Sequence, residues 1–378
     1  MSIKYDIDFD KGLVENGDDR YIRAFMKRAI AGESITVGFL GGSITQDAVT
    51  SEHRFCYAYR VYDWFCQKFP KAEIKYVNAG IGATDSEFAA ARVEEHLLQY
   101  NPDFILMEHA VNDGCNEHNK ETYEGVTRHI LLNNPKQALL QMCNVFYNDG
   151  ASAELMHRRV ARHYNLPVVS MRPTIYAALL EGKFDNRLIT HDDLHPNDDG
   201  HGLVAKVITT YLESILSSIK DEDKTEIEAR ILPEPLTLNR YQQSVKYDNR
   251  DESKLVSMSG FEADNTPQLQ IRDCFRFGYV AHKKGAYAEY EVEGSCIAIQ
   301  YKRTVNLPAP IAKVVIDGDE ENVVILDANF DETWGDKLEL TDVYMSEEKK
   351  TRKVRIEIIE DHPDDKGEFY LASVIVSG

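Results

Sequence analysis

The chain has 378 residues, of which 43% are hydrophobic and 28% charged, enough material for roughly two domains with real cores. Its 63 acidic and 43 basic side chains leave a net charge of −20, which argues against nucleic acid and anionic membranes as partners, because both are negatively charged. No apolar run reaches the roughly 20 residues that cross a bilayer.

Up to about residue 220, short apolar runs alternate with amphipathic segments. The runs predict strands buried on both faces: Ile35–Phe39, Ile74–Val77, Phe104–Met107, Leu139–Phe146 and Pro167–Val169. The segments predict helices at Tyr57–Phe69, Ser86–Leu98, Glu121–Leu132, Ser152–Tyr164, Thr174–Leu180 and Gly202–Ser218, the second of them with a capping box formed by Thr84 and Glu87. This alternation predicts an α/β fold, a three-layer α/β/α sandwich around a parallel sheet.

The second half of the chain has a different pattern. A charged stretch that ends in two prolines predicts a linker at 223–236, between a first domain at 1–222 and a second at 237–378. The second domain is rich in short β-prone runs separated by turn residues: Gln268–Phe277, Ala286–Glu291, Cys296–Tyr301, Lys313–Ile316, Val323–Leu326, Lys337–Val343, Lys353–Ile358 and Phe369–Val376. We expect an antiparallel β-sandwich of the jelly-roll type.

Four short motifs carry the chemistry of the first domain: GGSIT (41–45), NAGIGATDS (78–86), AVND (110–113) and HDDLHPNDDGH (191–201). The first three follow predicted strands directly. In a doubly wound sheet of order 2-1-3-4-5, the first strand lies between the second and the third, so the ends of these strands meet at one edge. We therefore expect Ser43, the Gly82–Ala83 turn and Asn112 to converge there.

The fourth motif supplies what a serine nucleophile needs. A serine hydroxyl attacks well only when an adjacent base accepts its proton, and the base must itself be oriented. His195 fits the base, and Asp192, three residues earlier, fits the group that orients it. The N–H of Ser43, an N–H of Gly82 or Ala83 and the amide of Asn112 would then form an oxyanion hole.

These motifs resemble those of the SGNH (GDSL-type) hydrolase superfamily, and the resemblance covers Ser43 to His195, most of the first domain. It implies a flavodoxin-like fold, esterase chemistry without a cofactor, and the roles assigned above. Two departures stand out. Gly42 replaces the usual aspartate before the serine, and Ala83 stands where the family pattern has its oxyanion glycine, so it stays open whether Gly82 or Ala83 supplies the N–H.

The two-domain plan resembles bacterial carbohydrate O-acetylesterases with a carbohydrate-binding-module-like domain, and specifically carbohydrate esterase family 17. The resemblance implies an acetylated oligosaccharide as partner, such as one derived from mannan, and leaves homo-oligomerisation open. Trp334 lies among polar neighbours in NFDETWGDK, so its indole is a candidate platform for a sugar. The start MSIKYDIDFDKG lacks a secretory signal and the six cysteines are scattered, so we expect a cytoplasmic protein.

Other interpretations remain. Ser43 could lie in an anion-binding turn, Asn112 could cap a helix, and Asp192 and His195 could be loop surface residues. His191, Asp192, Asp193, His195 and His201 could ligate zinc, although we expect no metal, because a metallo-esterase would not need Ser43 or Asn112. Acidic loops at 317–321 and 361–365 could hold calcium. The alternative functions are that of a lipase, thioesterase or arylesterase, and that of a catalytically silent sugar-binding protein.

Overall fold

A computed structural model describes residues 5–220, 222 and 225–378. The chain divides into two compact units, Met1–Thr237 and Leu238–Gly378, which we describe separately. The first two residues of the predicted linker, 223 and 224, lie outside the described residues, as do the first four residues of the chain. Among the described helices, none combines the length and the apolar character of a membrane span.

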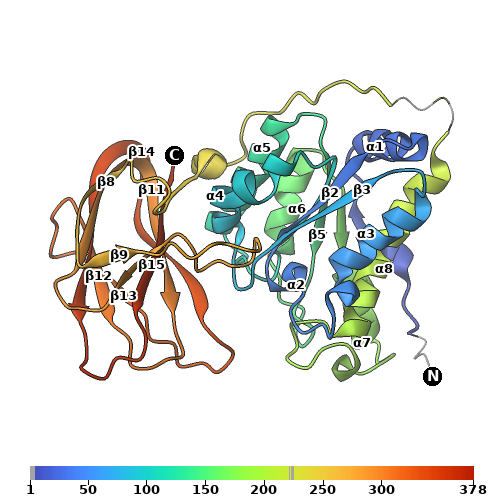
Figure 1. Cartoon of the computed structure of the whole chain (residues 1–378). Helices are drawn as coiled ribbons and strands as arrows, with labels where there is room; N and C mark the ends of the chain where they lie inside the picture. Colours follow the sequence, from blue (N-terminus) through green and yellow to red (C-terminus); the bar gives the residue numbers. More distant parts are fainter. Residues whose placement is uncertain (1–4, 221, 223–224) are drawn as a thin grey trace. The chain divides into compact units, whose positions relative to one another are not determined.

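The first unit is built on a six-stranded sheet in the order β1-β6-β5-β4-β2-β3 (Figure 1). The strands are β1 (Leu13–Glu15), β2 (Ile35–Gly41), β3 (Ile74–Gly80), β4 (Phe104–Glu108), β5 (Ala138–Cys143) and β6 (Val168–Ser170). Strands β2 to β6 run parallel, and β1 pairs antiparallel with β6 at one edge. β2 is buried throughout and lies between β3 and β4, as predicted from the order of the motifs.

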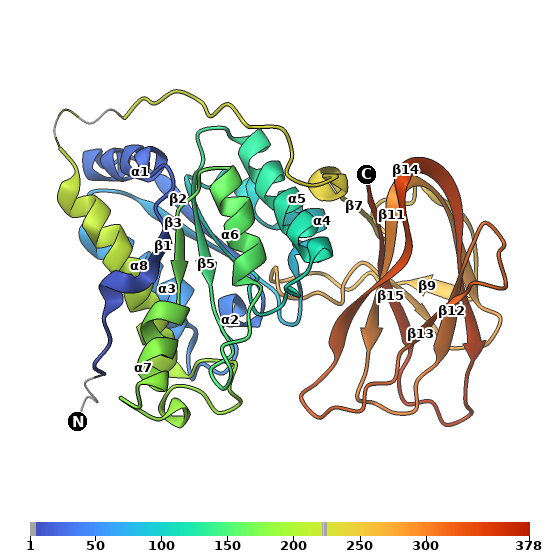
Figure 2. The same ribbon diagram turned by 180° about the vertical axis from the view of Figure 1, so that it is seen from behind.

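Helices cover both faces of this sheet (Figures 1 and 2). On one face lie α1 (Arg20–Ala31), α3 (Tyr57–Lys68) and α8 (Asp198–Ser218), and on the other α4 (Ser86–His96), α5 (Glu117–Asn133) and α6 (Glu154–His163). The first face holds an apolar core that includes Phe25, Phe65 and Phe104, whose rings pack on one another. The predicted three-layer α/β/α fold is confirmed.

The local predictions for this unit were wrong or incomplete at three places. Helix α1 was missed, although Tyr21, Ile22 and Phe25 recur at helical spacing and all are buried. The three-residue strand β1 was too short to give a pattern. The cap of α4 is Asp85 rather than the predicted capping box, because the Asp85 side chain accepts the N–H of residue 88 at 3.1 Å while Thr84 donates its hydroxyl to a backbone carbonyl.

The described part of the segment 223–236 packs against the first unit. Arg230 donates to the backbone carbonyl of Gln137 at 2.7 Å, and its guanidinium lies 3.4 Å from the ring centroid of Tyr21. Further along, the backbone N–H of Leu236 donates to the carboxylate of Glu124 at 2.6 Å. These contacts explain why the division between the two units falls after Thr237.

The strands of the second unit pair antiparallel; they are β7 (Val245–Tyr247), β8 (Leu255–Ser259), β9 (Phe261–Ala263), β10 (Tyr279–Ala281), β11 (Tyr287–Arg303), β12 (Ile311–Ile316), β13 (Val324–Asp327), β14 (Lys337–Glu360) and β15 (Phe369–Ser377). β11 and β14 are long and serve both layers of a sandwich. The first half of β11 pairs with β8 and the second half of β14, whereas its second half pairs with β15 and the first half of β14. Their inner faces enclose one apolar core.

This pairing also shows where the strand predictions for the second unit failed. The predicted strands Ala286–Glu291 and Cys296–Tyr301 both belong to β11, and Lys337–Val343 and Lys353–Ile358 both belong to β14. The register shift between Gly294 and Cys296 marks the break that the sequence suggested within β11. The predicted strand Gln268–Phe277 is a loop, because the Asp273 carboxylate accepts the backbone N–H groups of residues 269 and 270, which a strand would need for its ladder. The short strands β7 to β10 were missed.

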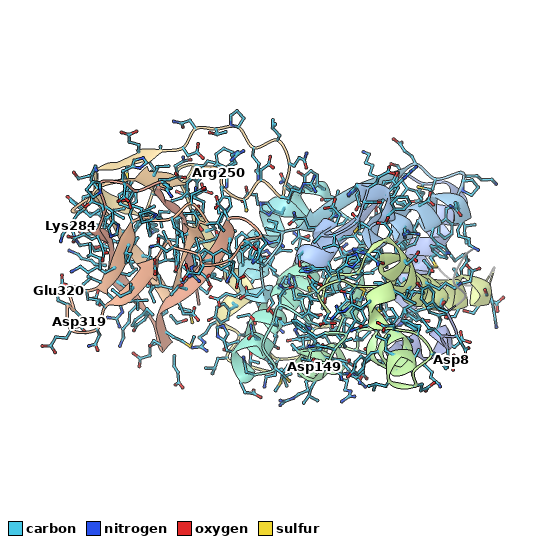
Figure 3. All side chains as sticks on the ribbon, turned by 90° about the horizontal axis from the view of Figure 1, so that it is seen from below. Asp8, Asp149, Arg250, Lys284, Asp319 and Glu320 are labelled. Atoms are coloured by element: carbon cyan, nitrogen blue, oxygen red, sulfur yellow. The ribbon has the colours of Figure 1, made fainter. Side chains whose placement is uncertain are left out.

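The acidic loop at 317–321 lies at the surface, where Asp319 and Glu320 are labelled in Figure 3. Its carboxylates are engaged by protein groups. Asp317 accepts from Arg352 at 2.6 Å, Glu320 pairs with Lys313 at 2.5 Å, and Asp319 accepts the side-chain amide of residue 322 at 2.8 Å. The loop is therefore held together by hydrogen bonds and ion pairs of its own.

Candidate active site

Ser43 occupies the position that the parallel sheet offers to a ligand. It begins the short helix α2 (Ser43–Gln46), with only Gly42 between it and the end of β2. Side chains at this position project from the carboxyl edge of the sheet, where open α/β sheets bind their substrates. The Ser43 side chain is half-buried, so its hydroxyl is both oriented by its neighbours and accessible.

Ser43, His195 and Asp192 form a hydrogen-bonded series. Ser43 Oγ lies 2.8 Å from His195 Nε2, and His195 Nδ1 lies 2.6 Å from Asp192 Oδ2. Because the carboxylate accepts the proton on Nδ1, Nε2 is left as the acceptor for the serine hydroxyl. The structure thus brings the three predicted residues together in the order that nucleophilic catalysis by serine requires.

Asp192 is held as a carboxylate by its own loop. Its Oδ1 accepts the backbone N–H groups of His195 and Leu194 at 2.8 and 3.1 Å, and the hydroxyl of Thr190 at 3.1 Å. Although partial burial opposes ionisation, the hydrogen bonds from His195 and Leu194 lower the pKa of Asp192 to about 2. At neutral pH the group facing His195 is therefore negatively charged, and it favours an imidazolium whenever His195 accepts a proton.

A second carboxylate, which the sequence did not single out as a positioning group, holds this loop in place. Asp193 has a left-handed backbone conformation, with φ +66°. Its carboxylate accepts Asn186 Nδ2 at 2.7 Å and Arg187 Nη2 at 2.9 Å, and Arg187 also donates to the carbonyl of His191 at 2.8 Å. These bonds fix the turn that directs Asp192 back toward His195.

The structure distinguishes between the two N–H groups considered for the oxyanion hole. The N–H of Gly82 donates to Oε1 of Gln46, at 2.5 Å, and Gln46 lies one turn after Ser43 on α2. No acceptor is recorded within the described chain for the N–H of Ala83, which has a left-handed backbone with φ +55°. Of the two N–H groups, that of Gly82 is thus the one with a recorded acceptor. Gln46 was missed, although the i, i+3 spacing from Ser43 could have drawn attention to it.

Asn112 packs against Gly42, the residue that stands where the superfamily usually has an aspartate before its serine. The backbone N–H of Asn112 donates to the carbonyl of His109 at 3.0 Å, in the turn that follows β4. Its carboxamide lies directly against Gly42, since a Cβ added there would come within 2.3 Å of Asn112 Oδ1 and 3.0 Å of Cγ. Any larger residue at 42 would displace the amide.

Four ionisable side chains are buried beneath this turn. Burial raises the pKa of Glu108 to about 7 and lowers the pKa of His109 to about 3, so His109 is neutral at physiological pH. The neighbouring Asp113 accepts the N–H of Ser86 at 2.8 Å through Oδ1, and its Oδ2 lies 2.8 Å from Nε2 of the buried His157. These groups connect the Asn112 turn to α4 and α6.

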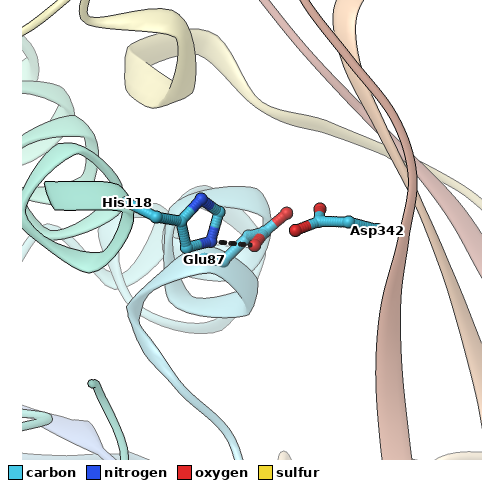
Figure 4. A group of neighbouring side chains, drawn as sticks. All are labelled: Glu87, His118 and Asp342. Carbon is cyan, nitrogen blue, oxygen red and sulfur yellow. Dashed lines mark hydrogen bonds and ion pairs between the residues drawn. The ribbon is translucent and has the colours of Figure 1, made fainter. Parts of the chain in front are cut away.

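Helix α4 secures the edge of the sheet from the other side. Arg92 is fully buried and donates to the carbonyl of Ala79 at 2.7 Å and to that of Gly41 at 3.0 Å, which ties the ends of β3 and β2 together. His118 Nε2 lies 3.0 Å from Glu87 Oε2, and this pair joins α5 to α4 (Figure 4). The strand ends that present Ser43 and the 82–83 turn are thus braced by buried polar contacts.

The remaining candidate residues lie in different surroundings. His201 is buried, its Nδ1 accepts the backbone N–H of Tyr57 at 3.1 Å, and burial lowers its pKa to about 4, so it joins α8 to α3 as a neutral histidine. In the second unit, the Trp334 side chain is 57% exposed and meets the ring of Phe330 edge-on, with 5.1 Å between the centroids. More than half of the Trp334 side chain is therefore exposed.

Comparisons with known proteins identify the family of the chain. The pattern of the GDSL-like lipase/acylhydrolase family matches residues 39–203, a range that contains all four motifs. None of the curated proteins matches the sequence.

Two solved structures match nearly the whole chain. A two-domain esterase active on acetylated mannans is 49% identical, with a TM-score of 0.94, over 98% of this chain and 99% of its own. A structure of a two-domain esterase active on acetylated mannans, co-crystallised with mannopentaose, is 48% identical, with a TM-score of 0.93, over 99% of both chains. The chain therefore belongs to the GDSL-like lipase/acylhydrolase family, the SGNH hydrolases, and is a carboxylic ester hydrolase.

Proposed function

We propose that this enzyme removes O-acetyl groups from carbohydrate, with acetylated manno-oligosaccharides as the substrate class, through an acetyl-serine intermediate on Ser43. The observation that carries the chemistry is the hydrogen-bonded series Ser43–His195–Asp192. The substrate class is supported by the full-length likeness to a two-domain esterase active on acetylated mannans.

The reaction follows from the roles of these groups. Ser43 Oγ attacks the acetyl carbonyl carbon, and His195 Nε2 accepts the hydroxyl proton while Asp192 stabilises the imidazolium. The tetrahedral intermediate then collapses, His195 returns the proton to the departing sugar oxygen, and acetyl-Ser43 remains. Water, activated by His195, attacks the acetyl carbonyl in turn and releases acetate, which restores the serine.

Three donors would stabilise the negative oxygen of each tetrahedral intermediate: the backbone N–H groups of Ser43 and Ala83, and the side-chain amide of Asn112. A single donor of this kind typically lowers the barrier by about 3–4 kcal/mol. We assign the second donor to Ala83 rather than Gly82, because the Gly82 N–H already donates to Gln46.

The proposal is tested by Ser43→Ala. Hydrolysis of 4-nitrophenyl acetate should fall by roughly three to six orders of magnitude while the thermal unfolding of the protein is unchanged. Exposed Ser217, at the end of α8, offers a matched control, and Ser217→Ala should retain the wild-type rate. A near-wild-type rate in Ser43→Ala would refute the assignment of the nucleophile.

The substrate class is tested by acetate release from acetylated manno-, xylo- and pectic oligosaccharides. A carbohydrate acetylesterase should also prefer 4-nitrophenyl acetate strongly over the butyrate and longer esters, because a small acyl pocket excludes them. A preference for longer acyl chains would indicate the lipase-like alternative. Oligosaccharide binding without acetate release would indicate a catalytically silent sugar-binding protein.

For the second unit we propose a carbohydrate-binding-module-like role, with Trp334 as a stacking platform for a sugar ring. The exposed indole of Trp334 supports this role, because an aromatic face packs well on the C–H groups of a sugar. Trp334→Ala should weaken the binding of manno-oligosaccharides to the full chain in calorimetry. The cytoplasmic breakdown of imported mannan fragments stays a proposal, tested by fractionation of the cells that produce the protein.

A further inference from the structure

A pocket of about 440 Å³ lies in the first unit, next to the catalytic loop. It is lined by the loop that follows β5, by α7 (Ala177–Leu180) and by the turn at 184–187. The residues that matter for its chemistry are Tyr147, Asn148, Leu180, Phe184, Arg187 and Asp193. None of them belongs to the hydrogen-bonded series that begins at Ser43.

The pocket is coupled to the catalytic loop through Asp193. The backbone N–H of Tyr147 donates to the carbonyl of Asp193 at 2.7 Å, while Arg187 holds the Asp193 carboxylate at 2.9 Å. Asp193 directly follows Asp192, which orients His195. The loop that carries Tyr147 leaves the carboxyl end of β5, so the pocket opens on the edge of the sheet that also presents Ser43.

Its chemistry favours a neutral, polar ligand. Arg187 and Asp193 pair at 2.8 Å, and the third charged residue of the lining, Asp185, accepts the backbone N–H of Arg187 at 2.8 Å, so the lining leaves no unpaired cation to attract an anion. The Asn148 side chain is exposed, and no hydrogen bond to its amide is recorded within the described chain. Tyr147 contributes to the lining, while its hydroxyl is buried. The exposed amide of Asn148 can donate to and accept from sugar hydroxyls.

The apolar part of the lining fits the same class of ligand. Leu180 is 71% exposed, and Phe184 is held in place by the ring of Tyr5, with 5.0 Å between the centroids. Apolar side chains beside unused hydrogen-bonding groups match a pyranose, which has C–H faces and a rim of hydroxyl groups.

We propose that this pocket is a subsite for a glycosyl unit of the oligosaccharide, one other than the unit that carries the reacting acetyl group. The inference rests on the proposed function, since it presupposes an oligosaccharide substrate. It predicts that affinity rises with chain length until the pocket is filled, and that Asn148 and Leu180 contribute to this rise.

The test compares two substrates on the same preparations of the full chain. For Asn148→Ala and Leu180→Ala, the ratio of kcat/KM on acetylated manno-oligosaccharides to kcat/KM on 4-nitrophenyl acetate should fall about tenfold, since the small ester does not reach the pocket. Gln99→Ala, an exposed residue of the same unit remote in sequence from this pocket, should leave the ratio unchanged. An unchanged ratio in both pocket variants, or an equal loss on both substrates, would overturn the subsite.

A second measurement separates this inference from the proposed function. Manno-oligosaccharides of increasing length are titrated calorimetrically into Ser43→Ala protein, which binds without turnover, and into the same protein with Asn148→Ala. The subsite predicts that lengthening the chain tightens binding, and that Asn148→Ala removes this gain. If wild-type enzyme releases no acetate from any oligosaccharide, the proposed function fails, and the titration still decides the subsite. If the pocket variants lose activity on 4-nitrophenyl octanoate but on no other substrate, the pocket binds acyl chains and the proposal is overturned.

Discussion

Replacing Gly42 by alanine tests the contact that sets the oxyanion amide. The added Cβ would lie 2.3 Å from Asn112 Oδ1, closer than Cβ atoms come to other atoms in proteins, and 3.0 Å from Cγ, which is tighter than most such contacts. The Asn112 carboxamide must therefore move, and its donor is lost from the oxyanion hole. Loss of one such donor typically costs about 3–4 kcal/mol, so kcat on 4-nitrophenyl acetate should fall roughly 100- to 1000-fold.

The assay is steady-state hydrolysis of 4-nitrophenyl acetate, with circular dichroism to verify the fold. Gly202→Ala is the matched control, since its added Cβ would meet Arg60 at an ordinary 3.5 Å, and it should retain full activity. If Gly42→Ala acts through Asn112, adding Gly42→Ala to Asn112→Ala should cost little more than Asn112→Ala alone. A Gly42→Ala enzyme within about threefold of the wild-type rate, or fully additive losses, would refute the reasoning.

Three further predictions concern the surroundings of the site. Ala83→Gly relieves the strain of a left-handed backbone at φ +55° and keeps the N–H. The free energy of unfolding in urea should therefore rise by about 0.5–1 kcal/mol with esterase activity retained, and a lower free energy of unfolding would contradict this. Gln46→Met removes the acceptor of the Gly82 N–H, and kcat should fall about tenfold at unchanged KM. Gln46→Glu keeps an acceptor and should recover part of this loss. If kcat in Gln46→Met is unchanged or higher, the donor role returns to Gly82. Glu108 has its pKa raised by burial from 4.5 to about 7, so its contribution to stability is greatest below pH 4.5 and declines as pH rises toward 7, because the unfolded state releases its proton first. Glu108→Gln should therefore gain stability relative to wild type, on the order of 3 kcal/mol, between about pH 5 and pH 8 in urea titrations, and a pH-independent difference would contradict this.

Strong periodic signals allowed the architecture to be predicted from the sequence. Five buried apolar runs gave the parallel sheet, and the motifs that follow the first three of them gave the place of β2 between its neighbours, because side chains at the ends of adjacent parallel strands must meet. The same reasoning gave the convergence of Ser43, the 82–83 turn and Asn112. His195 and Asp192 were assigned instead from the need of a serine for an oriented base and from their three-residue spacing.

Features that depend on side-chain competition for backbone groups could not be predicted. The Asp273 carboxylate accepts the backbone N–H groups of residues 269 and 270, which a strand at 268–277 would need for its ladder. Because aspartate is common in turns and loops, its presence alone does not reveal this competition. The choice between Gly82 and Ala83 depends on one hydrogen bond, from the Gly82 N–H to Oε1 of Gln46, and the need for Gly42 depends on the position of the Asn112 amide. Spacing could draw attention to Gln46, but it does not reveal which N–H its side chain accepts or where the Asn112 amide lies.

The central claim, a covalent acetyl-serine formed by Ser43, is tested most directly by mass spectrometry of enzyme quenched during turnover of 4-nitrophenyl acetate. Wild-type protein should carry one acetyl group on the peptide that contains Ser43, and the label should disappear once the ester is exhausted. Ser43→Ala protein should carry none on that peptide. Rapid acetate release by Ser43→Ala, or a transient acetyl group on a different residue of the wild-type enzyme, would contradict the account.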